Sequence, residues 1–193
     1  MAKKLLSEIV NIKTGHSFRG TVKRVVGGGA YAIQARDITM LGEFTLNTVI
    51  ETEFRGKREP DWIKKGDVIF ISKGWRTTAC YIEQDWENLT SVSSLYILRA
   101  KPEWQDHINM EFIAWLINQP PAQKQIRRNA EGVGHVNVRK QTLGELVVGV
   151  PPLDKQDIIA KLYKDSVSEQ KLITQLIHNR AQQGGAIAAA LLG

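Results

Sequence analysis

The first hundred residues alternate short apolar runs with glycine, asparagine and charged turn residues, a pattern typical of short β-strands. The clearest run, VIFIS at residues 68–72, predicts a buried strand. An amphipathic turn over residues 5–12 leads into a first strand, and the other predicted strands are Ala30–Gln34, Val49–Phe54, Ala79–Ile82, Val92–Leu98 and Leu146–Val150. Because turn signals, not helices, separate most of these runs, we expect a compact, mixed, barrel-like sheet.

Helical spacing of apolar residues begins after residue 100. Pro102 suits the first turn of a helix, and Ile108, Phe112 and Leu116 then recur at helical intervals until the proline pair at residues 120–121. A second short helix is expected over Ala122–Asn129. The predicted fold class is therefore α+β: a mixed, barrel-like β domain with packed helices, followed by a long C-terminal helix of the coiled-coil type.

The segment VVGVPPLDKQDII, residues 147–159, joins a strand to that long helix. Pro151 and Pro152 fix φ and remove two backbone donors, so neither strand nor helix continues through them. We expect Asp154 to cap the helix, which no proline or glycine interrupts until Gly184 and Gly185 end it. The predicted organisation is a domain over residues 1–150 and a helical arm over residues 151–193. An ordinary strand-to-helix connection remains the alternative.

The predicted C-terminal helix carries an apolar stripe with spacings of three and four. Its members are Ile159, Leu162, Tyr163, Val167, Ile173, Leu176 and Ile177. Such spacing is typical of a helix that packs along a partner helix, so we predict that these residues form a dimerisation surface. The alternative is a core helix of the same domain, although its length and its position after the two prolines favour a protruding arm.

Composition excludes several classes of protein. The chain has 193 residues, of which 42% are hydrophobic and 24% charged, as in ordinary globular proteins. No apolar stretch suits a membrane span or a signal peptide, and the single Cys80 excludes a disulfide framework. We therefore expect a cytoplasmic protein with no membrane contact. Scattered histidines predict no metal site, and the absence of methyltransferase, Walker and dinucleotide motifs predicts no cofactor and no catalytic activity.

The net charge of +6 is concentrated in the N-terminal half of the chain. Residues 1–100 carry 15 basic and 11 acidic side chains. Local excess of positive charge favours a polyanionic partner, because neutralised phosphates release counterions. A surface charged for solubility is the alternative.

Five short segments resemble, in order, those of the specificity subunits of type I restriction–modification enzymes. They are LxEIxxIxxG at residues 6–15, IQARDI at residues 33–38, KxGDVIFxxKG at residues 64–74, a glycine-containing zone at residues 132–138, and the PPL junction at residues 151–153. Together they extend over nearly the whole chain. The resemblance implies a target-recognition domain followed by a coiled-coil helix.

The family resemblance also implies a function without catalysis. Such a subunit binds double-stranded DNA and positions methyltransferase (modification) subunits and the restriction subunit on it. Full-length members resemble two recognition domains in tandem, each followed by a helix, whereas this chain has one of each. The resemblance thus implies a half-subunit that forms a homodimer through antiparallel helices and reads a symmetric, interrupted target. Two alternatives stay open: a free-standing DNA-binding regulator or anti-restriction decoy, and a protein-binding structural module.

Candidate DNA contacts gather in four groups. Arginine, glutamine and asparagine read base edges, while lysine, arginine and hydroxyl groups bind phosphates. The predicted DNA-binding residues are Lys13, Ser17, Arg19, Lys23 and Arg24; Gln34 and Arg36; Arg55, Lys57 and Arg58 together with Lys73, Trp75, Arg76 and Thr77; and Lys124, Arg127, Arg128, Asn137 and Arg139. For each group, a solvated face is the alternative, and Gln34 and Arg36 could instead satisfy backbone groups.

Overall fold

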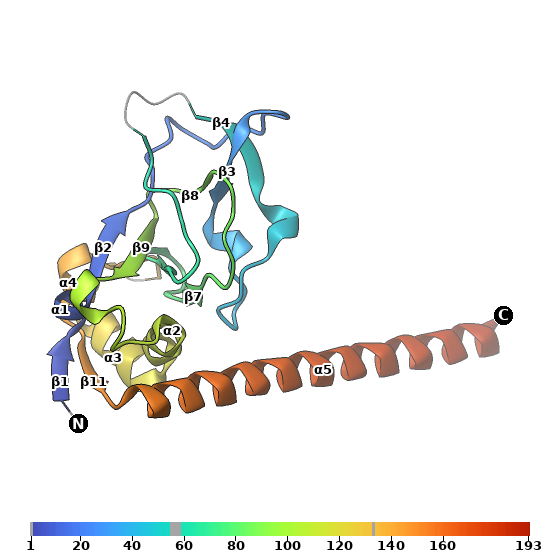
Figure 1. Cartoon of the computed structure of the whole chain (residues 1–193). Coiled ribbons are helices and arrows are strands. Elements are labelled where there is room, and N and C mark those ends of the chain that lie inside the picture. Colours follow the sequence, from blue (N-terminus) through green and yellow to red (C-terminus); the bar gives the residue numbers. More distant parts are fainter. Residues whose placement is uncertain (1, 55–58, 133) are drawn as a thin grey trace.

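The fold is α+β, as predicted, and it has three layers and a projecting helix (Figure 1). The computed structural model describes residues 2–54, 59–132 and 134–193. A four-stranded sheet lies in the middle, short helices cover one of its faces, and a three-stranded sheet packs against the other face. The long helix α5 leaves this body and extends well beyond it.

The central sheet is antiparallel, with the strand order β2-β9-β5-β7. Its strands are β2 (Val10–Thr14), β9 (Leu95–Ala100), β5 (Val68–Ile71) and β7 (Ala79–Tyr81). Strand β5 is buried on both faces, because successive side chains of a strand point to opposite sides. Val68 and Phe70 enter the core under the helices, whereas Ile69 and Ile71 enter the core between the two sheets. The continuous apolar run in the sequence follows from this double burial.

The second sheet has the order β4-β3-β8 and is mixed. Its strands are β3 (Gly29–Ile33), β4 (Ile50–Glu53) and β8 (Leu89–Ser91); β3 pairs antiparallel with β4 and parallel with β8. The 3-10 turns η1 (Ala35–Asp37) and η2 (Leu46–Thr48) lie between β3 and β4. The strand predicted over residues 92–98 corresponds to β9 but begins three residues too early, since β8 ends at Ser91 and β9 begins at Leu95. A turn separates them, in which the Leu95 amide donates to the Val92 carbonyl at 2.9 Å.

The helices on the outer face of the central sheet are short. They are α1 (Leu6–Ile9), η3 (Pro102–Trp104), α2 (Met110–Asn118), α3 (Pro120–Arg128) and α4 (Lys140–Gly144). Pro102 starts only a 3-10 turn; α2 begins later because the Asn109 side chain caps it, accepting the amides of Glu111 and Phe112. Helix α3 begins two residues earlier than predicted, since Pro120 fits its first turn.

Two small ribbons complete the fold. Strand β6 (Lys73–Gly74) pairs with β10 (Val136–Asn137). Strand β1 (Ala2–Leu5) pairs antiparallel with β11 (Val147–Val150), so the N-terminus lies beside the start of α5 (Figure 1). Strand β1 was not predicted, because AKKL has no strand pattern of its own.

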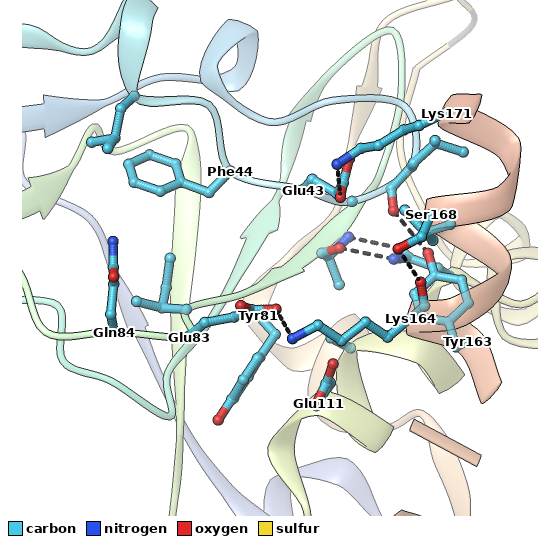
Figure 2. A pocket seen from close by; sticks show the side chains of 18 of the residues that line it. Glu43, Phe44, Tyr81, Glu83, Gln84, Glu111, Tyr163, Lys164, Ser168 and Lys171 are labelled. Atoms are coloured by element: carbon cyan, nitrogen blue, oxygen red, sulfur yellow. Dashed lines mark hydrogen bonds and ion pairs between the residues drawn. The ribbon is translucent and has the colours of Figure 1, made fainter. Parts of the chain in front are cut away.

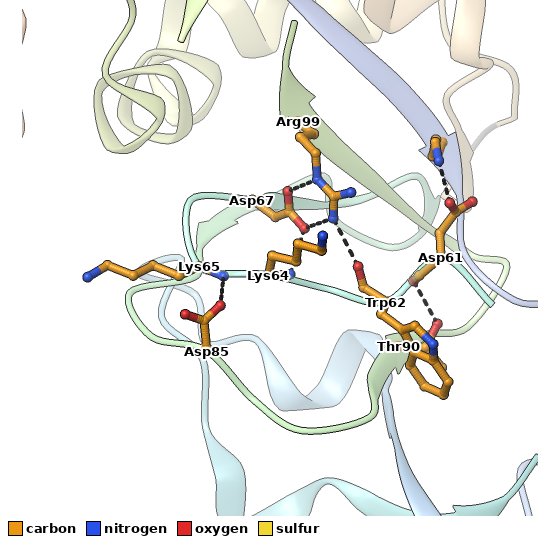
Figure 3. Close-up of polar contacts among 9 residues, drawn as sticks. Asp61, Trp62, Lys64, Lys65, Asp67, Asp85, Thr90 and Arg99 are labelled. Carbon is orange, nitrogen blue, oxygen red and sulfur yellow. Dashed lines mark hydrogen bonds and ion pairs between the residues drawn. The ribbon is translucent and has the colours of Figure 1, made fainter. Parts of the chain in front are cut away.

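The KxGD segment before β5 is anchored by a buried ion pair (Figure 3). Arg99 on β9 donates from Nε to Oδ1 of Asp67 at 2.7 Å and from Nη2 to Oδ2 at 2.6 Å, and Asp67 also accepts the Lys64 amide. The same guanidinium donates to the Trp62 carbonyl, and the hydrogen bond to Asp67 is the main cause that raises the pKa of Arg99. Two parallel hydrogen bonds of this kind fix geometry as well as charge. They hold the turn before β5 against β9.

Helix α5 (Leu153–Leu192) is 40 residues long, or about 60 Å. Two predictions about its ends are wrong. Pro152 occupies the N-cap position with no side-chain hydrogen bond, so Asp154 lies in the first turn and does not cap it. At the other end the helix continues through Gly184 and Gly185, because the following AIAAALL consists of helix-favouring residues. Within the described ranges, no helix is long and apolar enough to cross a membrane.

Two faces of α5 have different surroundings. Gln156, Ala160, Tyr163 and Val167, spaced by four, three and four residues, face the body of the protein; all are buried except Tyr163, which is half-buried. Every residue after Val167 is exposed. The first part of α5 therefore packs as a core helix, and the second part projects as an arm.

Candidate nucleic-acid interface

Two loops with predicted DNA contacts leave the same end of the central sheet. Thr14 at the end of β2 and Phe70 near the end of β5 both pair with Tyr96 of the intervening strand β9. Neighbouring strands are about 4.8 Å apart, so the two strand ends lie about 10 Å from each other. The loop of residues 15–28 follows β2, and the loop of residues 72–78 follows β5. The register thus brings together two loops whose first residues are more than fifty positions apart in sequence.

The first loop presents cations to solvent. Ser17, Arg19, Lys23 and Arg24 are all exposed, and within the described residues none of the three cations forms an ion pair. Lys13, by contrast, lies on β2 itself and forms an ion pair with the Asp61 carboxylate. The loop can therefore offer its charges to phosphates, while Lys13 would first have to leave Asp61.

The second group of predicted contacts surrounds the loop after β5. Lys73 on β6 is in register with Asn137 on β10. The Thr77 hydroxyl donates to Gln123 Oε1 at 2.6 Å, which ties this loop to helix α3. Lys124, Arg127 and Arg128 of α3 are exposed, carry no ion pair in the described part of the chain, and line a shallow depression with Asn118, Pro120 and Gln123. Arg139 is exposed but paired with Glu131.

The side chains of Arg76 and Thr77, both predicted DNA contacts, form hydrogen bonds within the protein. The Arg76 guanidinium donates to the carbonyls of Thr39 at 2.6 Å, Ala35 at 3.0 Å and Ile38. Partial burial lowers its pKa. Thr77 is buried against Gln123. Arg76 is thus bonded to the turn at residues 35–39 and Thr77 to helix α3, so neither side chain is free for a ligand.

Trp75 remains a candidate contact. Its ring is 65% exposed and lies 5.3 Å from the Arg76 guanidinium carbon, in the geometry of a cation–π pair. Three carbonyls fix the position of Arg76, and the indole of Trp75 packs against its guanidinium. Trp75 is therefore a rigid aromatic surface at the edge of the basic group.

The structure separates Gln34 from Arg36. Arg36 is exposed, with Nε 3.9 Å from Oδ1 of the fully buried Asp37. The Gln34 amide donates to Asp37 Oδ2 at 2.7 Å, while its side-chain Nε2 is buried with no partner among the described residues. Arg36 can reach a ligand, and Gln34 belongs to the turn. Arg55, Lys57 and Arg58 lie outside the described residues.

A pocket of about 450 Å³ lies between the β-strands and α5, and the sequence did not reveal it (Figure 2). Lys164 donates to Glu83 at 2.8 Å and Lys171 to Glu43 at 2.6 Å across its mouth, and the Tyr163 hydroxyl donates to the Leu41 carbonyl at 2.8 Å. Glu111 faces the same space, and burial raises the pKa of its carboxyl. The pocket has three carboxylates, and both of its lysines are already paired, so it does not suit a phosphate. Its ion pairs and the Tyr163 hydrogen bond hold α5 against the body of the protein.

The predicted dimerisation residues divide between the two faces of α5. Ile159 and Tyr163 are half-buried and Val167 is buried against the protein's own body. Leu162, Ile173, Leu176 and Ile177 are each more than half exposed. The first three side chains already have partners within the chain, which revises the predicted surface, and the other four remain free to bind one.

The described residues contain no group of three or more histidine, cysteine, aspartate or glutamate side chains that could hold a metal ion. Cys80 is buried in β7. The arrangement offers exposed cations, hydroxyl groups and one aromatic ring at one end of a sheet. These groups are suited to binding a polyanion.

Comparison with known proteins gives consistent results. A family model described as "Type I restriction modification DNA specificity domain" matches residues 1–179. No curated protein sequence matches the chain. The fold is similar to that of the HsdS subunit from Thermoanaerobacter tengcongensis, with 16% identity and a TM-score of 0.63 over 91% of this chain and 44% of that one.

Two further solved structures are similar. One is the type I restriction–modification S subunit from M. genitalium, with 16% identity and a TM-score of 0.51 over 89% of this chain and 39% of that one. The other comes from work on complex assembly and conformational transition of the type I R-M system, with 15% identity and a TM-score of 0.65 over 94% and 45% of the two chains. At such identities the likeness concerns the fold, and this chain spans less than half the length of the solved chains.

The family model, however, covers nearly the whole chain, including the sheet, its loops and the packed part of α5. The chain therefore belongs to the type I restriction–modification DNA specificity family.

Proposed function

We propose that this chain binds double-stranded DNA in a sequence-specific manner and directs the methyltransferase and restriction subunits of a type I system to it. The chain itself performs no chemistry in this proposal, and it acts in the cytoplasm, where the DNA is. The observation that carries the proposal is the set of exposed, unpaired cations on two loops at one end of the central sheet and on helix α3, which Thr77 links to the second loop.

The positions of these cations argue for DNA and against a merely soluble surface. On α5, exposed cations are paired in part, as Lys164 is with Glu83 and Lys171 with Glu43, and the unpaired Lys155 and Lys161 do not belong to this group. Arg19, Lys23, Arg24, Lys73, Lys124, Arg127 and Arg128 carry no such pair in the described part of the chain. Unpaired cations bind phosphates without first breaking an ion pair. Trp75 adds an apolar face for a sugar or base.

In this proposal the chain forms a homodimer through α5. The exposed face of α5 supports pairing, because Leu172, Ile173, Leu176 and Ile177 together leave an apolar surface in water. A symmetric dimer presents two recognition domains, which predicts a target in two symmetric halves.

The salt dependence of binding tests the DNA proposal. The logarithm of the binding constant for duplex DNA falls linearly with the logarithm of the salt concentration. The slope is about 0.9 for each phosphate that the protein neutralises. Replacing both Arg127 and Arg128 with alanine should lower that slope by about two. The matched control replaces Lys155 and Lys161, two exposed lysines of α5, with alanine and should leave the slope unchanged.

Two results would overturn the proposal. Absence of duplex binding between about 50 and 200 mM salt would exclude the DNA-binding function and favour a protein-binding module. An equal loss of slope in the control would show that net charge, and not this interface, governs binding. Co-purification with a methyltransferase subunit then separates a working specificity subunit from a free-standing regulator or decoy.

A further inference from the structure

Val26 is an apolar side chain presented to solvent at the tip of a basic loop. It is 86% exposed, and among the large exposed apolar residues of the described chain only Leu192, at the end of α5, is more exposed. Lys23 and Arg24 precede it, both exposed and unpaired in the described structure. The loop therefore presents one apolar side chain directly after two unpaired cations.

The turn that carries Val26 is built rigidly. The Gly28 amide donates to the Val25 carbonyl at 3.1 Å, which makes Val26 and Gly27 the central pair of a β-turn. Gly27 has a φ of 75°, which suits the third position of a type II turn. A side chain at Gly28 would lie 2.5 Å from the Thr52 backbone, so the turn packs directly on β4.

Glu51 of β4 fixes the same turn from the side. Its carbonyl accepts the Val25 amide and its carboxylate accepts the Gly27 amide, both at 2.9 Å. The carboxylate is thereby directed at the turn backbone. In Figure 1 the loop between β2 and β3, in blue, passes the end of β4 on the side of the molecule away from α5. Three hydrogen bonds and the close contact of Gly28 with β4 fix this turn, so it loses little conformational entropy when it binds a ligand.

The chemistry of the DNA major groove suggests what an apolar tip would contact. The base edges there are donors and acceptors, with one apolar group, the C5 methyl of thymine. A cytosine methylated at C5 presents the same group. Amide and guanidinium side chains cannot select for a methyl, whereas an aliphatic side chain on a fixed turn can.

We propose that Val26 is a specificity-determining residue that contacts the C5 methyl group of one thymine in each half of the DNA target. This inference rests on the proposed function, because it requires that the loop enter the major groove. Lys23 and Arg24 then bind the phosphates beside the groove and set its approach. Val26 adds selectivity and little to the binding of unrelated DNA.

The test uses the chain of residues 1–193 and shortens each partner of the contact in turn, the thymine and the valine. Targets are first selected from a random duplex library with the wild-type chain. Each thymine of the selected target is then replaced singly by deoxyuridine, which lacks only the C5 methyl, and affinities are measured for wild type and for Val26→Ala. A duplex with cytosine at the responding position is then compared with one that has 5-methylcytosine there. The difference in affinity shows whether the methyl group itself is recognised.

At one thymine per half-site we expect deoxyuridine to weaken wild-type binding about fourfold to tenfold. Val26→Ala should lose a similar factor on the thymine target and show no further loss with deoxyuridine, and 5-methylcytosine should bind the wild type better than cytosine does. Met40→Ala, which removes an exposed apolar side chain elsewhere, should bind as wild type. Because Gly27 holds the strained turn position, alanine at residue 26 preserves the fold.

The possible failures are distinguishable. If the wild type selects a sequence but Val26→Ala gives the same deoxyuridine profile as wild type, the Val26 inference is wrong and the DNA function stands. If the wild type selects no sequence, the proposed function fails, and the inference that rests on it fails too.

Discussion

The side chain of Gln156 on α5 accepts a hydrogen bond from the backbone amide of Asn109 at 2.9 Å, which connects the start of α5 to the residue that caps α2. Its Nε2 donates to the carbonyls of His107 at 3.0 Å and Pro151 at 2.8 Å. Gln156 is fully buried, and both of its side-chain donors and its side-chain oxygen have partners within the protein. One glutamine thus joins the Pro-Pro junction, the loop before α2 and the first turns of α5.

Gln156→Leu should lower the free energy of unfolding by about 2–4 kcal/mol, because it leaves one buried amide and two carbonyls without partners. Urea denaturation followed by circular dichroism measures the change. Gln182→Leu makes the same replacement at an exposed position of α5 and should alter stability by less than about 0.5 kcal/mol. Equal stability of Gln156→Leu and wild type would refute the structural role assigned to this glutamine.

Arg76 should matter for stability and not for the salt dependence of DNA binding. Its guanidinium donates to the carbonyls of Ala35, Ile38 and Thr39. Arg76→Ala removes these charged hydrogen bonds and should cost about 2–3 kcal/mol. Thermal and urea unfolding check this, with Arg127→Ala as the control that should weaken DNA binding and leave stability unchanged. A reduced salt slope with unchanged stability would return Arg76 to the set of DNA contacts.

The parts of the fold that were predictable are those where one local signal dominates. The apolar run at residues 68–72 indicated a buried strand. The two prolines at residues 151–152 interrupt regular secondary structure between the last strand and the long helix. The pairing of β1 with β11 was not predictable, because the polar segment AKKL becomes a strand only when β11 lies beside it. Likewise, helix α5 passes two glycines because the alanine-rich segment after them favours helix.

The candidate site was predictable in its composition and less so in its membership. The residue types that bind phosphate could be found from the sequence, but their partners could not. Arg76 reaches carbonyls 37 to 41 positions earlier, and Lys13 reaches Asp61 across 48 positions. Such long-range pairs depend on the register of the sheets. Val26 could not be predicted as a contact from the sequence, since its side chain has no charge and no hydrogen-bonding group.

Cys80 should be unreactive in the folded protein. It is fully buried in β7, and burial, with smaller contributions from Glu43 and Glu83, raises the pKa of its thiol to about 12. Raising the pH from 7 to 9 should therefore not speed its reaction with an aromatic disulfide reagent, as it would for an exposed cysteine. One thiol per chain should react after unfolding in guanidinium. A fast, pH-dependent reaction of the native protein would contradict this burial.

The proposed dimer predicts a monomer when charge enters the exposed face of α5. Ile173 and Leu176 are more than half exposed, and glutamate at both would bring like charges together in an antiparallel helix pair. We expect the mass in solution, measured by light scattering, to fall from that of two chains to one chain of 21.7 kDa, with unchanged helix content. Gln175 and Gln182 lie on the opposite side of the helix, at about 100° per residue, so glutamate there adds the same charge and should leave the dimer intact. A dimer that survives the change at Ile173 and Leu176 would mean that another surface joins the two chains.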